Sequence, residues 1–518
     1  LKPLRLKAAQ PCSSSLRSMR LPRRFRFPKR LLILSCIAAA CCRVRNAKAL
    51  TWPWHTRSSI RYHRRPAWLV SCGSPVARLG TRAHPTVEGT LSDPKLSPRA
   101  LTAAIVKNII GAGILCFPSV VASGTGVVPS CALILLLALA SGYTFSMVGR
   151  LSGALGCTTS SELYELAWGG RRAAWLSAGL FLLLFLGCVM LTMMLTSLTA
   201  PYSPIPSGHA VLVTMLLVPI ALQRDLHNLK LCNRAGLISV FYTVGVMLLR
   251  LGDGSYSAGG SFVQGAAVRS VQGGASPLAF AKFGLFHLTA QSFNFLSVCN
   301  INFLAHGNVP RYYEEMEKTQ QGAAADRRRF HRIALASFSL AAALCVSVAL
   351  SGIWTFGGAQ YLPLVGERAG AGAGGIGLHA LVLNNYARGD VLAQIAVLAT
   401  VPSVIACWAA VFLGLKDSMK SLIASGSASP ARERLLSLGL LGLCGLIALV
   451  TPSLGRLVAV RGALLGSIFV FVAPAALWLK LGRRAGIELK RGERLLAWAV
   501  LAYGLLSCVL GTLFALLL

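Results

Sequence analysis

The sequence predicts an all-α, polytopic membrane protein. Two observations carry this prediction. Of the 518 residues, 55% are hydrophobic and only 13% are charged, whereas a typical soluble domain has about 25% charged residues. From residue 101 onward, apolar runs alternate with polar loops, and most of the runs approach the roughly 20 residues that a helix needs to cross a bilayer.

Residues 1–100 are predicted to be a basic, disordered extension that precedes the membrane domain at 101–518. They carry 21 Lys and Arg against two acids, Glu88 and Asp93. The single apolar run, Leu31–Cys42, is too short to cross a membrane and resembles the core of a signal peptide, and the Arg-rich stretch after it resembles an organelle transit peptide. The extension is interpreted either as a targeting sequence or as an artefactual leader.

The membrane domain is predicted to contain about eleven transmembrane helices. Their expected ranges are 101–121, 127–149, 173–199, 207–222, 235–251, 280–306, 332–354, 389–413, 435–451, 456–479 and 495–517. Alternate loops hold 22 Lys and Arg on one side and 7 on the other. Because cytoplasmic loops are enriched in positive charge, this asymmetry predicts a cytoplasmic N-terminus.

Several classes of function are disfavoured. The net charge of +35 comes without a nucleic-acid-binding pattern, so loop charge is the better explanation and the expected partner is the lipid bilayer rather than nucleic acid. Most of the 15 cysteines lie singly in apolar runs and show no metal-binding spacing. We therefore predict no metal, no cofactor and no enzymatic activity.

The helix at 101–121 has the most informative polar pattern. Two glycines, Gly111 and Gly113, flank Ala112 inside an apolar run. They favour either close helix packing or an unwound turn, and an unwound turn is tolerated in a membrane only where it lines an enclosed cavity. Lys107 and Asn108 precede the glycines, and a lysine at this depth should face the bundle interior.

The helix at 280–306 is the second polar helix. It contains more amides and hydroxyls than a lipid-facing helix would favour, so these residues predict either interhelical hydrogen bonds or a second unwound segment. The polar residues expected inside the membrane are Lys107, Asn108, His287, Gln291, Asn294, Asn300, Asn302, His306, Gln394 and Thr400.

Five motifs in order resemble the amino acid/auxin permease family, whose conserved unit is the amino acid transporter transmembrane domain. They are KNIIGAGILCFP (Lys107–Pro118), SELYELAWGG (Ser161–Gly170), FLAHGNVPRYYEEM (Phe303–Met316), TVPSV (Thr400–Val404) and the run Thr451–Leu479. The third motif is nearest to the vacuolar and plant-type branch. The resemblance covers residues 100–517.

The resemblance implies a leucine-transporter-like 5+5 inverted repeat, with helices 1 and 6 broken and helix 11 added. It also implies secondary active transport of amino acids by alternating access, with small neutral amino acids as the expected substrates. Substrate is expected at Gly111, Ala112, Gly113 and Ile114 of helix 1 and at Asn294, Ser297 and Asn300 of helix 6. The residues expected to bind the coupling ion or to gate are Lys107, Asn108, Thr400 and His306.

The coupling ion is predicted from a departure at Lys107. Sodium-coupled relatives tend to carry Asn at this position, four residues before the first glycine. A fixed ammonium would repel a cation 4 Å away by about 4 kcal/mol at an effective dielectric of 20, whereas the hydroxyl of Thr400 could serve a sodium site. We favour proton coupling or uniport over sodium coupling, with a sodium-coupled symporter as the alternative.

The sequence also leaves open a non-transporting amino acid sensor on the same fold. A channel is disfavoured, because the sequence shows neither a charge ring nor a carbonyl filter. A vacuolar or other endomembrane location is favoured, and a plastid location is open because of the N-terminal extension.

Overall fold

The structure is a computed structural model, and it describes residues 95–122, 125–203, 208–223, 230–257, 260–262, 286, 288–289, 292–356, 381–423, 430–451, 454–487 and 489–517. The chain divides into two units, Leu1–Gly89 and Thr90–Leu518. All described residues belong to the second unit. The predicted extension at 1–100 therefore lies outside the described residues up to position 94.

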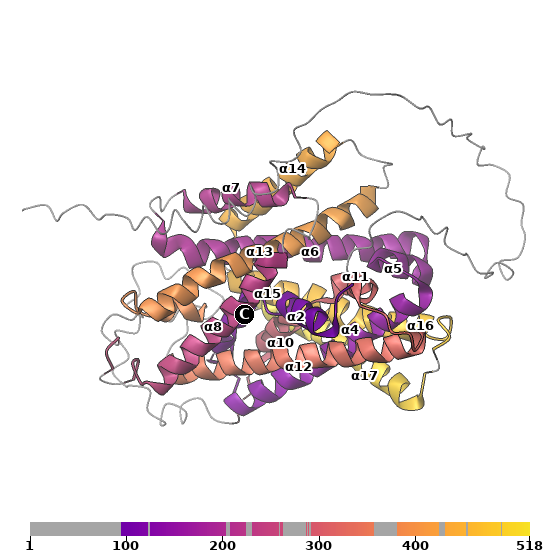
Figure 1. The fold of residues 1–518 in the computed structure, drawn as a ribbon, viewed down its shortest axis with the longest axis horizontal. Coiled ribbons are helices and arrows are strands. Elements are labelled where there is room, and N and C mark those ends of the chain that lie inside the picture. The colour runs from indigo at the N-terminus through magenta and orange to yellow at the C-terminus, as the bar shows by residue number, and fades with distance from the viewer. Residues whose placement is uncertain are drawn as a thin grey trace, which may run out of the picture. The chain divides into compact units, whose positions relative to one another are not determined.

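Helices make up nearly all of the described chain (Figure 1). The α-helices are α2 (Pro98–Ile109), α3 (Phe117–Ala122), α4 (Val127–Leu155), α5 (Ser160–Trp168), α6 (Gly170–Thr199), α7 (His209–Ala221), α8 (Lys230–Gly252), α10 (Ser292–Asn302), α11 (Val309–Glu315), α12 (Ala323–Phe356), α13 (Val391–Ile423), α14 (Pro430–Val450), α15 (Leu454–Val460), α16 (Ala473–Leu481) and α17 (Arg491–Leu517). Two isolated bridges, Leu96 with Met316 and Thr125 with Leu288, are the only β-pairing among the described residues.

Short helical segments join some of these helices. The 3₁₀ segments are η2 (Ala112–Cys116), η3 (Ala200–Tyr202), η5 (His306–Asn308) and η6 (Val382–Asn385), and the π-helical segments are η7 (Arg461–Gly466) and η8 (Ile468–Val472). We refer to α2, η2 and α3 together as span 1, and to α15, η7, η8 and α16 together as span 10.

Eight helices in the described part of the chain are long and apolar enough to cross a membrane, and the bent span 1 makes nine. This arrangement confirms the predicted all-α, polytopic fold class. The expected count of eleven is not confirmed, because α7 has 13 residues and α10 has 11, both shorter than the roughly 20 residues of a full crossing.

The helix expected at 280–306 is wrong at its start. Among the described residues, α10 begins only at Ser292, and Leu288 instead pairs with Thr125 in a bridge. The Ser292 hydroxyl accepts hydrogen bonds from the Thr289 amide at 3.2 Å and from the Thr125 hydroxyl at 3.1 Å. The chain just before α10 is therefore held by the segment between span 1 and α4 and does not continue the helix at this point.

Glycines bring α4 and α12 into close contact. A Cβ added at Gly142 would lie 3.0 Å from Cβ of Phe338, and one added at Gly149 would lie 2.1 Å from Cε1 of Phe330. Phe145 lies between these positions and stacks on Phe330 with ring centroids 5.8 Å apart. Small residues thus let aromatic side chains fill the helix interface, as is common where lipid offers no hydrophobic driving force.

Burial separates the central spans of the bundle from the peripheral ones. Helix α13 packs against α6 and α8, and span 10 packs against α10 and α17. In its most apolar 18-residue window, span 10 is 72% buried, against 22% for α14 and 28% for α17. Span 10 is therefore a central element, whereas α14 and α17 lie at the periphery, where they would face lipid (Figure 1).

Candidate functional site

Span 1 is unwound at its glycines. Helix α2 ends at Ile109, Gly111 is extended with φ −89° and ψ −169°, and the helical halves on either side are bent by 48°. The second glycine has room only because it lacks a side chain: a Cβ at Gly113 would lie 2.3 Å from Oδ1 of Asn302, whereas one at Gly111 would make ordinary contact at 3.8 Å from Sγ of Cys407. The close approach to Asn302 explains the second glycine.

A cavity of about 110 Å³ lies against this break. Span 1, α6, α10 with the segment after it, α13 and span 10 all contribute to its wall. Most of the wall is apolar, and its polar side chains are Asn108, Asn302, Asn308, Cys407 and Arg461. None of the described residues that line the cavity is acidic.

Lys107 lies behind the break and connects three helices. Its Nζ donates hydrogen bonds to the carbonyl oxygen of Ser403 at 3.3 Å and to Sγ of Cys407 at 3.1 Å, and its side chain is 3% exposed. A Cβ at Gly236 of α8 would lie 2.4 Å from Cε of Lys107. The ammonium thus occupies the junction of α2, α8 and α13, facing the bundle interior as expected.

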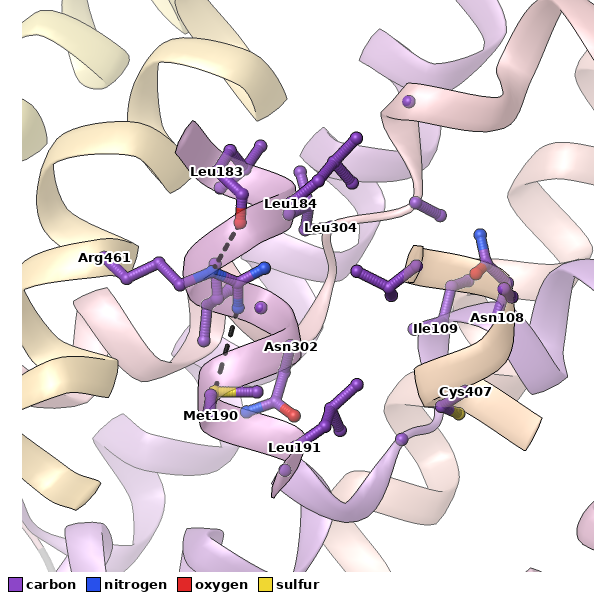
Figure 2. Close-up of a pocket in the computed structure, with 18 of the residues that line it drawn as sticks. Asn108, Ile109, Leu183, Leu184, Met190, Leu191, Asn302, Leu304, Cys407 and Arg461 are labelled. Carbon is purple, nitrogen blue, oxygen red and sulfur yellow. Dashed lines mark hydrogen bonds between the residues drawn. The ribbon is translucent and has the colours of Figure 1, made fainter. Parts of the chain in front are cut away.

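Arg461 forms the opposite wall of the cavity from Cys407 and Asn108 (Figure 2). Its Nε donates to the carbonyl oxygen of Leu183 at 3.0 Å, and its Nη1 lies 3.7 Å from Sδ of Met190. The side chain is 5% exposed. Each ion pair in the described part of the chain involves other residues, so the guanidinium has no carboxylate partner there.

The expected residues of span 1 and α10 lie in different surroundings. Gly111, Gly113 and Asn108 line the cavity, and Ile114 is buried beside them. Asn300 is completely buried away from the lining: its Nδ2 donates to the hydroxyls of Ser467 at 3.0 Å and Ser507 at 2.9 Å.

Ser297 and Asn294 do not line the cavity either, among the described residues. The Ser297 hydroxyl donates to the carbonyl oxygen of Phe293 at 2.9 Å, and Asn294 is buried. The part of α10 that lines the cavity is its last turn, which contains Asn302. The segment after α10 also lines it, through Ala305 among others.

Thr400 and His306 are not among the described residues that line the cavity. Thr400 is buried in α13, where its hydroxyl donates to the carbonyl oxygen of Ala396 at 2.8 Å and lies 3.4 Å from the hydroxyl of Thr243. His306 is buried in η5, with its Nε2 3.0 Å from the hydroxyl of Thr144. His287 and Gln291 lie outside the described residues.

Sequence reasoning missed Arg461 as a site residue. The predicted loop at 452–462 contributes Arg461 to the smaller set of 7 Lys and Arg, and this assignment is wrong, because the arginine lies inside span 10. The signal was present, since the predicted helix at 456–479 contains it, and an arginine within a span is a functional candidate by default. The part played by α6 could not be predicted, because its lining residues are ordinary apolar side chains.

The fold and cavity are those of a membrane transporter with a broken first span. A comparison with protein families matches residues 94–360 to the transmembrane amino acid transporter protein family. The chain belongs to this family, which confirms the resemblance found in the sequence and makes the protein a multi-pass transporter rather than an enzyme. The vacuolar and plant-type branch is not confirmed.

A comparison with curated proteins gave no match. Among solved structures, the chain is similar to a Na⁺-coupled sialic acid symporter in a substrate-bound outward-open state, with 13% identity, a TM-score of 0.47, and coverage of 82% of this chain and 90% of that one. It is also similar to the Eremococcus coleocola manganese transporter, with 14% identity, a TM-score of 0.48, and coverage of 81% and 85%.

Proposed function

We propose that this protein is a secondary active transporter of amino acids that works by alternating access. The observation that carries the proposal is the unwound turn of span 1 against a cavity between the helices. Irregular backbone inside a membrane is tolerated where it lines a cavity, and half-helix ends there supply ligands for a charged substrate.

The cavity suits the two charged groups of an amino acid. After the break, the amides of Gly113 and its neighbours lie at the N-terminal end of η2, which favours a carboxylate. Helix α10 ends at Asn302 beside the cavity, and the carbonyl groups at a helix C-terminus favour an ammonium. The cavity has a volume of about 110 Å³, and Arg461 adds a positive charge to its wall that a neutral side chain would not use.

We propose a proton rather than sodium as the coupling ion. The ammonium of Lys107 already occupies the junction of α2, α8 and α13 and uses the Ser403 carbonyl as its acceptor. A sodium ion at this junction would have to displace the ammonium or approach it against electrostatic repulsion.

The orientation follows from loop charge. Once Arg461 is assigned to span 10 rather than to an outer loop, the asymmetry between the two sets of loops becomes larger. We propose that the N-terminus and the basic loop before α12 face the cytoplasm. Vacuolar or other endomembranes stay the favoured location.

The test is uptake of radiolabelled amino acids into proteoliposomes that contain the full chain. We expect accumulation driven by an imposed pH gradient at constant sodium. Strong stimulation by a sodium gradient at constant pH would contradict the proton as the coupling ion, but it would leave the proposal that the protein transports amino acids intact. A sensor would bind amino acids without transporting them. Flux measured with and without residues 1–100 would show whether the extension contributes to transport.

A further inference from the structure

Arg461 is a buried positive charge that the proposed transport cycle does not yet use. It lies in the π-helical segment η7 of span 10 and reaches the cavity wall. π-Helical turns are rare and often occur at functional sites. A charged side chain inside a membrane is costly unless it is paired or faces water, so its presence needs an explanation.

A purely structural role leaves most of the guanidinium unexplained. Only Nε and Nη1 have partners, a carbonyl oxygen and a thioether, and within the described part of the chain Nη2 makes no hydrogen bond. Holding α6 against span 10 would need one neutral donor, whereas a guanidinium has five N–H donors in a fork that matches a carboxylate.

The surroundings provide space for the guanidinium but no counter-charge. A Cβ at Gly187 would lie 2.6 Å from Nη2 and 3.2 Å from Cζ of Arg461, so this glycine of α6 makes room for the charged group. Gly187 also lines the cavity. Since the described lining has no acid, the positive charge would be neutralised only by what enters the cavity.

We propose that Arg461 binds a second carboxylate of the substrate, so that the transported amino acids are acidic ones. This inference rests on the proposed function. The α-carboxylate would lie at the break of span 1 and the side-chain carboxylate at Arg461, on the opposite wall of the cavity (Figure 2). A carboxylate paired with the guanidinium offsets the cost of burying the charge. A substrate with a neutral amide in place of that carboxylate would leave the buried charge uncompensated.

The experiment compares isosteric pairs, glutamate with glutamine and aspartate with asparagine, as radiolabelled substrates of the full chain in proteoliposomes. We expect the acids to be taken up faster than the amides by about tenfold or more, the factor typical of one charged hydrogen-bonded contact. Arg461→Met should lower this acid-to-amide ratio by about the same factor, and Arg461→Lys should give an intermediate ratio because it keeps the charge without the fork.

The control is Lys416→Met. Lys416 is also buried, but it lies outside the described cavity lining and donates to the carbonyl oxygen of Ala221 at 3.1 Å. Its loss should leave the acid-to-amide ratio unchanged even where total uptake falls. A ratio is the readout because a merely structural arginine would alter all substrates alike.

Each outcome decides the inference. Uptake of amides or other neutral amino acids without the acids by the unaltered chain overturns it while the proposed function stands. Uptake of neutral amino acids that requires chloride, measured by replacing chloride with nitrate, would identify an inorganic anion at Arg461 and also overturn it. No uptake of any amino acid would contradict both. The unaltered chain gives these answers even if Arg461→Met fails to fold.

Discussion

The Nζ of Lys107 lies 3.3 Å from the carbonyl oxygen of Ser403. The contact joins α2, one turn before the break of span 1, to α13, just after the internal Pro402. Two helices that border the cavity are therefore held together by a charged hydrogen bond next to the unwound turn. Breaking this bond would also shift the cavity wall, because Cys407 in that wall contacts the same ammonium.

Replacing Lys107 should separate exchange from accumulation. We expect Lys107→Met to lose accumulation driven by a pH gradient, because the charged hydrogen bond that joins α2 to α13 beside the break is lost. Exchange of internal for external substrate should persist, because the cavity itself is unchanged. Proteoliposome uptake and counterflow, measured on the same preparation, provide the two readouts. Full pH-driven accumulation by this variant would contradict the assigned role.

Gly111→Val should abolish flux and leave the protein in the membrane. A Cβ at Gly111 would make only ordinary contact with Cys407, at 3.8 Å, but the two methyl groups of valine would extend into the cavity. We expect uptake to fall by about tenfold or more, since overpacking an enclosed space shifts its walls. The matched control is Gly245→Val in α8, where nothing lies within 4 Å of an added Cβ. Normal transport by Gly111→Val would contradict the proposed substrate site at the break of span 1.

Cys407 should report on occupancy of the cavity. Its thiol lies at the cavity wall and is partly accessible. We expect N-ethylmaleimide to inhibit uptake in the unaltered protein but not in Cys407→Ser, which keeps an acceptor for Lys107. Bound substrate should slow the inhibition. Equal inhibition of both proteins would mean that a different cysteine is responsible.

Arg250 and Asp390 should contribute to stability rather than to substrate choice. The two side chains form a bidentate pair, with Nη2–Oδ1 at 2.7 Å and Nε–Oδ2 at 2.8 Å, and Asp390 is completely buried at the start of α13. The Tyr256 hydroxyl donates to the same carboxylate at 3.0 Å, and burial raises the pKa of this phenol, which keeps it a donor.

Asp390→Ala removes the buried carboxylate but leaves Arg250 its second partner Asp253, with Nη1–Oδ2 at 2.7 Å, so the loss of stability should be smaller than the cost of about 3–5 kcal/mol for a fully broken buried pair. We expect a clear fall in the thermal denaturation midpoint of the purified protein in detergent. The double variant Arg250→Met/Asp390→Ala should recover part of the loss. The acid-to-amide uptake ratio should not change, and a change would place this pair in the substrate pathway.

The sequence was sufficient for the general architecture. Long apolar runs and their charged ends predict α4, α6, α12 and α17 because hydropathy alone dictates them, and the glycine pair together with the family resemblance predicts the break of span 1. Helix lengths were underestimated at polar ends, as for α12, which begins at Ala323 rather than at 332. A helix continues beyond the hydrocarbon when its backbone bonds are satisfied internally, and hydropathy does not detect these turns.

The site was harder to predict because it is formed by contacts between distant segments. Asn300 and Asn302 are two residues apart, yet only Asn302 lines the cavity, while Asn300 is fully hydrogen-bonded to span 10 and α17. Polarity indicates that such a side chain is buried but not which neighbour it has. Arg461 was missed for a different reason: its charge was attributed to a loop, so burial was not expected at all.

The most direct test of the account is uptake of radiolabelled amino acids by proteoliposomes that hold the full chain, with the outside made acidic and sodium equal on both sides. The account predicts accumulation above the equilibrium level that collapses when a protonophore is added. Binding of amino acids without any flux, under every imposed gradient, would contradict the claim that this protein is a transporter of amino acids.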